Sequence, residues 1–142
     1  MNKPRLFIAF IVVFVLLELT GYLINQVLLM SAYEGLKNVF RPFDEMMSKM
    51  WIMYVVDIVW SFFFVFIFVK GYENKGVMEG IRYGVYMGLF VSLIAAYAQY
   101  VVYPLPYSLA LQWFIYGLIQ QIIFGVAAAL IYKPKAAAAA AA

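Results

Sequence analysis

The sequence contains no cysteine and no histidine. Without cysteine there are no disulfides and no iron–sulfur ligation, and without histidine as well the ordinary zinc sites are excluded. The absence of histidine also removes the usual haem ligand and the usual general base of a catalytic triad. We therefore expect a non-catalytic protein that holds no cofactor and no metal centre of its own.

Charged residues are scarce as well, at 12% of the chain, whereas 68% of the residues are hydrophobic. A soluble domain is about one quarter charged and about half apolar, so this composition is poorly suited to a surface in water. Long apolar runs instead indicate a protein embedded in a lipid bilayer. The basic residues form no surface stripe, and we expect no binding to nucleic acid.

The apolar residues form four continuous runs, each long enough for the roughly 20 residues of a membrane-spanning helix. Continuous rather than alternating runs disfavour a membrane β-barrel. The first run is too long for a signal peptide and has no convincing cleavage site. We expect an all-α, membrane-embedded four-helix bundle of two helical hairpins, forming a single domain over residues 1–135. The spans are expected at about 6–30, 51–69, 77–103 and 107–132, and the alanine run at 136–142 is given no functional weight.

The basic residues are distributed unevenly between the two sides that these spans define. Only Lys37, Arg41 and Lys49 lie on the side of the connection between the first two spans. Since cytoplasmic loops carry the excess of Lys and Arg, we expect both termini to lie in the cytoplasm. The basic residues on that side are Lys3, Arg5, Lys70, Lys75, Arg82, Lys133 and Lys135.

The connection between the first two spans has apolar residues at helical spacing, from Tyr33 to Met50. Pro42 interrupts the pattern and is followed by Asp44 and Glu45, an order typical of the first turn of a helix. We therefore expect the second helix to begin near Pro42, with a short amphipathic segment before it on the outer surface. That segment is either a lid over a cavity or an interfacial anchor.

A stripe of small residues at four-residue spacing runs along the third span. Each glycine inside a helix costs roughly 1 kcal/mol relative to alanine in water, but in lipid small residues let two helix backbones approach closely. The stripe predicts a packing ridge of the glycine-zipper type, either against the fourth span or against another subunit. Its members are Gly76, Gly80, Gly84, Gly88, Ser92 and Ala96, and the matching positions on the fourth span are Gly117, Gly125 and Ala129.

Polar residues lie within the spans, and ionisable groups there are functional candidates because their burial in lipid is costly. We expect a polar cavity open to the outer side, with Glu18 at its floor and Asp57 on its wall. The alternative is that these groups only bond the helices to one another. Near the inner surface, Glu79 and Arg82 are expected to form a local ion pair. The candidate ligand-binding residues are Glu18, Tyr22, Asn25, Tyr54, Asp57, Gln99, Gln112, Tyr116 and Gln120.

Three stretches, "FRPFDEMM", "KGYENKGVMEGIRYG" and "YPLPYSLALQW", resemble a family of small bacterial four-helix integral membrane proteins that has no defined activity. The resemblance implies a multi-pass protein of the bacterial inner (cytoplasmic) membrane. The layout is also similar to that of small multidrug-resistance transporters, in which the first span carries a glutamate that Glu18 would match. The long connection after the first span, Asp57 and the glycine ridge depart from that pattern.

Two functions follow as hypotheses. The first is an accessory or structural subunit that packs by its small-residue ridge into a larger membrane complex or a homo-oligomer. The alternative is a small carrier or binding protein for a cation, a lipid or a quinone, using the intramembrane carboxylates Glu18 and Asp57. In both cases the lipid bilayer is the surrounding partner.

Overall fold

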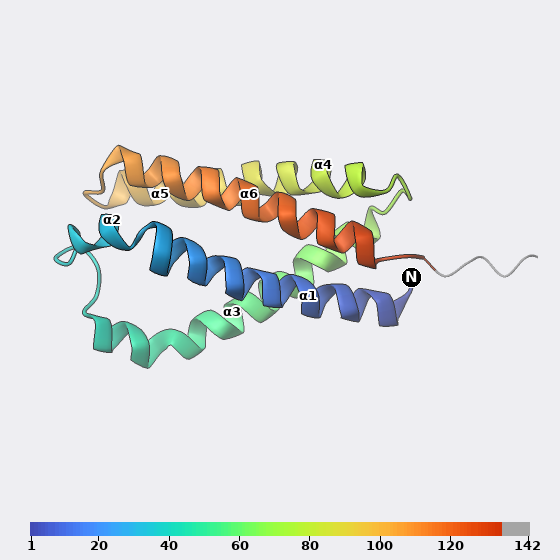
Figure 1. Cartoon of the computed structure of the whole chain (residues 1–142), viewed down its shortest axis with the longest axis horizontal. Helices are drawn as coiled ribbons and strands as arrows, with labels where there is room; N and C mark the ends of the chain where they lie inside the picture. The colour runs from blue at the N-terminus through green and yellow to red at the C-terminus, as the bar shows by residue number, and fades with distance from the viewer. Residues whose placement is uncertain (135–142) are drawn as a thin grey trace, which may run out of the picture.

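The computed structural model describes residues 1–134, so Lys135 and the alanine run lie outside the described residues. The described chain is helical, without strands, and its elements form four long rods (Figure 1). Leu23–Leu28 and Gly88–Leu93, named η1 and η2, are π-helical turns inside the first and third rods. The elements are α1 (Lys3–Tyr22), η1, α2 (Met30–Glu34), α3 (Phe43–Lys70), α4 (Val77–Met87), η2, α5 (Ile94–Val102) and α6 (Tyr107–Ile131).

All four rods are long and apolar enough to cross a membrane: Lys3–Leu28, Phe43–Lys70, Val77–Val102 and Tyr107–Ile131. The prediction of a four-helix integral membrane protein is therefore confirmed. The second rod begins at Phe43, directly after Pro42, and carries Asp44 and Glu45 in its first turn. This helix start follows the local sequence signal, since proline has no amide hydrogen to lose and the acidic groups suit the helix dipole.

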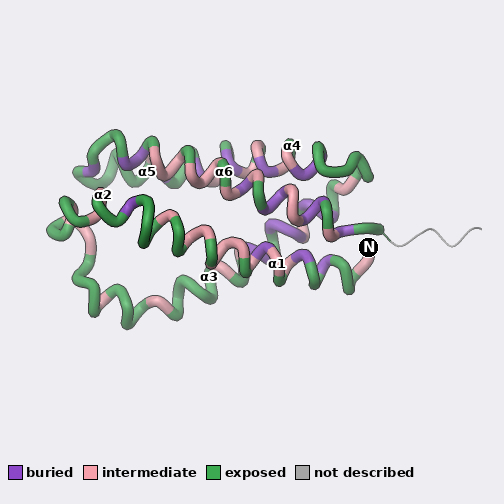
Figure 2. The backbone as a smooth tube through the Cα atoms, viewed as in Figure 1, coloured by how far each residue is buried: buried purple, intermediate pink, exposed green. Residues whose placement is uncertain are grey.

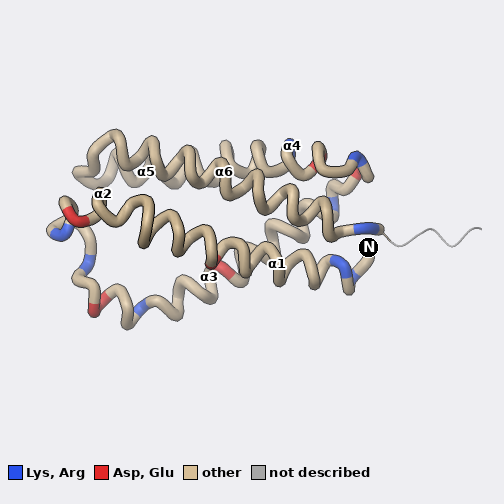
Figure 3. The backbone as a smooth tube through the Cα atoms, in the orientation of Figure 1, with Lys and Arg blue, Asp and Glu red and all other residues tan. Residues whose placement is uncertain are grey.

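The two chain ends lie at the same end of the bundle. The Asn2 backbone amide donates a hydrogen bond to the Tyr132 hydroxyl at 3.2 Å, and its Nδ2 donates to the Lys133 carbonyl at 2.9 Å. We name this the termini end, and the opposite end, with residues 29–42 and 103–106, the loop end. Lys and Arg gather near these two ends and are nearly absent from the middle (Figure 3). That the termini end faces the cytoplasm stays a prediction.

The main hydrophobic core occupies the half of the bundle nearest the termini end. It contains Phe64 of α3, Phe124 of α6 and Val13 of α1, all fully buried. The Phe64 and Phe124 rings meet edge to face with centroids 6.1 Å apart. Tyr83 of α4 adds a hydrogen bond from its hydroxyl to the Phe64 carbonyl oxygen, at 2.6 Å. Three rods are thus joined to α1 through this core.

A second, smaller apolar cluster closes the loop end. Leu29, Leu105 and Leu109 are buried, and the apolar side chains of α2 and the following turn, including Tyr33 and Phe40, pack against them. The amphipathic segment predicted before Pro42 therefore has its apolar side on the end of α6. The remainder of that stripe, from Phe43 onward, belongs to α3.

The small residues of the third rod face α6. An ideal Cβ placed on Gly84 would lie 2.5 Å from the Gln121 carbonyl oxygen, and one on Gly117 would lie 2.5 Å from the Ser92 Oγ. Gly80 likewise meets Gly125, and Gly88 meets Leu118, so the two backbones are nearly in contact along the ridge.

Gly76 departs from the prediction that it belongs to this ridge. It precedes the first residue of α4, has φ +71° and has nothing within 4 Å of an added Cβ. Its φ lies in the left-handed region, which glycine adopts readily. Gly76 therefore serves the turn between α3 and α4 and does not pack between helices.

Glu79 also departs from its predicted role. Its two carboxylate oxygens accept hydrogen bonds from the backbone amides of Glu73, at 2.6 Å, and Lys75, at 2.8 Å. Among residues 1–134 the ion pairs are Arg41–Glu45, Lys49–Glu45 and Lys75–Glu73, so Glu79 does not pair with Arg82. The buried Glu79 carboxylate thus holds the turn that leads into α4.

Candidate ligand-binding site

Two π-helical turns border one hollow in the half of the bundle nearest the loop end. Each π turn accommodates an additional residue in the helix, and such turns occur frequently at functional sites. The Leu29 amide bonds to the Ile24 carbonyl at 2.9 Å, which is the i to i−5 spacing of a π turn. Residues of both turns, Asn25 from η1 and Ser92 from η2, line the hollow together with α6.

This hollow, named here the polar crevice, has a volume of about 260 Å³. Its lining is uncharged. Amide and hydroxyl side chains converge on it from three rods, and four of them were predicted as site residues: Asn25, Gln99, Tyr116 and Gln120. Gln120 also donates from its Nε2 to the Thr20 hydroxyl at 2.7 Å, which ties α6 to α1 beside the crevice.

The other predicted site residues do not line the crevice. Tyr22 and Tyr54 are 68% and 49% exposed, so in a bilayer they face lipid. Gln112 lies on α6 nearer to the loop end and is half-buried.

Glu18 and Asp57 lie on α1 and α3, and neither lines the crevice. The Glu18 Oε1 is buried and has no hydrogen-bond partner among the described residues. Sequence periodicity identified the polar face of each helix, but the neighbour that each face meets depends on how the helices pack. The carboxylates therefore lie apart from the amides with which they were grouped.

A chain of hydrogen bonds forms one wall of the crevice. The indole Nε1 of Trp113 donates to the Tyr33 hydroxyl at 2.8 Å, and that hydroxyl donates to the Asn25 Oδ1 at 2.7 Å. The Asn25 Nδ2 in turn donates to the Gly21 carbonyl oxygen at 2.9 Å. Burial raises the pKa of Tyr33 above its ordinary value, and the hydrogen bond from Trp113 opposes this rise. The Trp113–Tyr33–Asn25 chain joins α6, the loop end and η1.

A groove lies on the other side of the Trp113–Tyr33–Asn25 hydrogen bonds. No residue of α3 from Phe43 to Trp60 is buried, because this half of the helix stands away from the bundle (Figure 2). Between it and the loop end are two adjoining hollows, of about 470 and 630 Å³, which we name together the groove. The apolar side chains of the larger hollow include Met30, Phe43, Met46, Met47, Met50, Ile52 and Met53.

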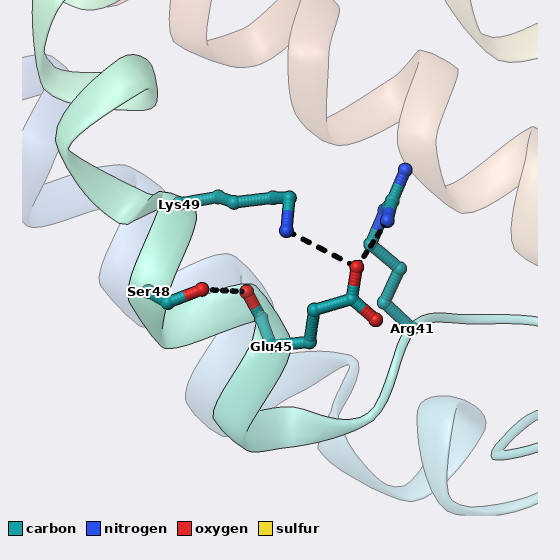
Figure 4. Close-up of polar contacts among 4 residues, drawn as sticks. All are labelled: Arg41, Glu45, Ser48 and Lys49. Atoms are coloured by element: carbon teal, nitrogen blue, oxygen red, sulfur yellow. Dashed lines mark hydrogen bonds and ion pairs between the residues drawn. The ribbon is translucent and has the colours of Figure 1, made fainter.

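The rim of the groove is charged and has an excess of basic groups, with Lys37, Arg41 and Lys49 against Glu34 and Glu45. Glu45 pairs with both Arg41 and Lys49, the latter at 3.1 Å, and the Ser48 hydroxyl donates to the Glu45 carbonyl oxygen at 2.7 Å (Figure 4). These groups are exposed, so their pairing organises the rim more than it stabilises the fold. The remaining basic side chain of the rim belongs to Lys37.

The groove and the crevice share a wall. Asn25 and Trp113 line both hollows, and Tyr33, which connects them by hydrogen bonds, lines the groove. The Trp113–Tyr33–Asn25 chain therefore separates an apolar space open toward α3 from a polar space between η1, η2 and α6.

Sequence reasoning did not identify the groove. The sequence does contain a pattern that indicates its apolar wall, because methionines recur at helical spacing at the start of α3. Methionine is flexible and polarizable and is common on surfaces that adapt to different apolar ligands. The separation of the first half of α3 from the rest of the bundle opens the groove, and no pattern in the sequence predicts it.

Comparison with protein-family models, curated proteins and solved structures gives no match. The resemblance to small bacterial four-helix membrane proteins therefore stays a prediction from three sequence stretches.

Proposed function

We propose that this integral membrane protein is non-catalytic and binds an amphipathic molecule of the bilayer, a lipid or a quinone, in the groove. The observation that carries the proposal is the stand-off of α3 from the loop end. It leaves a mostly apolar space between α3 and residues 25–41, at the loop end of the first rod. A ligand dissolved in the bilayer would reach such a space laterally, without crossing water.

The dimensions and chemistry of the groove support an amphiphile. Ligand sites usually measure about 300–1,000 Å³ and are mostly apolar with a few polar groups, and the larger hollow of about 630 Å³ fits that range. The charged rim lies at the beginning of α3, near Glu45. Met53 lies eight residues further along the helix, or about 12 Å deeper at 1.5 Å per residue. A polar head at the loop end of the groove and an apolar tail along the methionines would match both parts.

Glu18 and Asp57 lie beyond the deep end of the groove, since Asp57 follows Met53 by one helical turn. A cation held between these two carboxyl groups is the form that the cation-binding alternative takes in this fold. The double substitution Glu18→Gln with Asp57→Asn removes the charges while preserving side-chain size.

The test is native mass spectrometry of the protein purified in a mild detergent, with identification of the molecules that it retains. Met50→Trp fills the groove and is expected to remove the retained amphiphile. The matched control is Val56→Trp, which places the same side chain on an exposed part of α3 outside the groove. Equal retention by the wild type and Met50→Trp would refute the proposal.

The second candidate function is that of an accessory subunit in a larger membrane complex. The same half of α3 favours it, because a helix of a partner or of a second copy could cover that surface. The small-residue ridge supports this function less, since Gly80, Gly84 and Gly88 already face α6 within the chain. Affinity purification from native membranes in a mild detergent decides between the two. A stoichiometric membrane partner favours the subunit, and a solitary protein that retains lipid or quinone favours the ligand-binding function.

A further inference from the structure

The polar crevice contains hydrogen-bonding capacity that the chain itself leaves unused. The side-chain hydrogen bonds of its lining residues, among residues 1–134, are those of Asn25, Trp113 and Gln120. Gln99, which is exposed, and Tyr116, which is half-buried, make none, so their amide group and hydroxyl are accessible to a bound molecule. The crevice therefore offers both hydrogen-bond donors and hydrogen-bond acceptors to a ligand.

The absence of charged side chains from the lining of the crevice restricts the class of ligand that it can bind. No Asp, Glu, Lys or Arg lines the crevice, so an ionised phosphate there would have no counter-charge. Burial of an unpaired charge costs several kcal/mol in a protein interior. The basic side chains Lys37, Arg41 and Lys49 line the groove and not the crevice, so they place no counter-charge inside the crevice. A neutral group that donates and accepts hydrogen bonds avoids the penalty, and a hydroxyl does both.

The volume of the crevice and its position beside the groove restrict the ligand further. A volume of about 260 Å³ corresponds to about nine water molecules at roughly 30 Å³ each, which is room for a glycerol or a single hexose. The crevice also adjoins the groove at Asn25 and Trp113. A molecule with its tail in the groove could place its head group in the crevice if the Tyr33 hydroxyl released its two partners.

We infer that the polar crevice is a head-group site for a lipid with an uncharged, hydroxyl-bearing head, of the size of a glycerol or one hexose. The Trp113–Tyr33–Asn25 chain is then the barrier that the head group crosses between groove and crevice. This inference rests on the proposed function, because the lipid tail occupies the groove. It adds the chemical class of the head group and the residues that recognise it.

The experiment is native mass spectrometry of the full chain in detergent, titrated with three lipids of identical acyl chains. These are a monohexosyl diacylglycerol, a phosphatidylglycerol and a phosphatidylethanolamine. The wild type is expected to prefer the hexosyl lipid. Gln99→Leu and Tyr116→Phe are each expected to weaken that lipid by about fivefold to tenfold, as loss of one or two hydrogen bonds implies, with little effect on the phospholipids.

Gln112→Leu is the matched control, because it makes the same change on α6 outside the crevice and should leave all three affinities unchanged. Tyr116→Phe keeps the shape of the side chain, so its affinity for the hexosyl lipid tests the inference even if Gln99→Leu does not fold. Equal affinity of the wild type for the three lipids, or a hexosyl-lipid affinity unaffected by Tyr116→Phe, would overturn the inference. If Met50→Trp still abolishes lipid binding in that case, the proposed function stands. If the wild type binds none of the lipids, this inference fails, whereas the proposed function still stands if the purified protein retains a quinone that Met50→Trp removes.

Discussion

Gly84 provides the sharpest test of how α4 and α6 pack. In Gly84→Ala the added Cβ would lie 2.5 Å from both the Gln121 carbonyl oxygen and the Ile122 Cα. Ordinary contact begins at 3.4 Å, so these atoms would be about 0.9 Å too close. Both obstacles are backbone atoms of a helix, which cannot rotate away as a side chain can. The substitution must therefore move α6 as a whole or unwind a turn.

The expected cost follows from that displacement. Overpacking a well-packed interior typically costs about 1–3 kcal/mol, and backbone obstacles favour the upper part of that range. Alanine recovers up to about 1 kcal/mol because it is the better helix former. We expect a net loss of about 2 kcal/mol in the free energy of unfolding of Gly84→Ala.

The control for this prediction is Gly21→Ala. Gly21 also lies inside a helix, α1, but an added Cβ there has nothing within 4 Å. It should be neutral or slightly stabilising. Reversible unfolding of both variants in mixed micelles of mild detergent and sodium dodecyl sulfate gives the two free energies. If Gly84→Ala proves as stable as Gly21→Ala, the close approach of the α4 and α6 backbones is refuted.

Three further predictions concern the loop end and the turn before α4. Tyr33→Phe should lower the free energy of unfolding by about 1–2 kcal/mol and alter the fluorescence of Trp113, because it removes two hydrogen bonds and leaves their partners unpaired. The control is Tyr22→Phe, which changes an exposed tyrosine. Equal effects of the two substitutions would contradict the role of the Trp113–Tyr33–Asn25 hydrogen bonds. Since burial raises the folded-state pKa of Tyr33, its contribution to stability is fully present below its unfolded pKa near 10 and is lost as pH rises through the folded value. Wild-type unfolding should therefore show a decline in stability above about pH 10 that Tyr33→Phe reduces; an unchanged decline would refute the assignment. Glu79→Ala should cost about 3 kcal/mol, because two backbone amides of the 71–76 turn lose a charged acceptor, and a loss below about 1 kcal/mol would exclude that role.

Much of the fold could be predicted from the sequence. Four apolar runs indicated four spans, and Pro42 with Asp44 and Glu45 indicated where α3 begins, because both signals act within a few residues of chain. Periodicity also identified the small-residue face of the third rod. It could not distinguish Gly76 from Gly80, since the spacing is the same while only Gly80 lies inside the helix.

The candidate site could be predicted only in part. Asn25, Gln99, Tyr116 and Gln120 do converge, because the polar stripes of three rods face a common interior. Glu18 and Asp57 shared the same periodic signal but lie on α1 and α3 and do not line the crevice. A stripe determines the face of a helix, and the helix that meets that face is chosen by packing.

The sequence by itself determined that this chain is a four-helix membrane protein, because hydropathy and local helix signals act along the chain and need no knowledge of neighbours. Only the tertiary structure decided that α3 stands away from the loop end, that Asn25 and Trp113 border two hollows, and that Tyr33 joins them. Each of these depends on contacts between residues far apart in the sequence. Such contacts are set by how the helices cross, and the hydrophobic pattern of one helix does not contain that information.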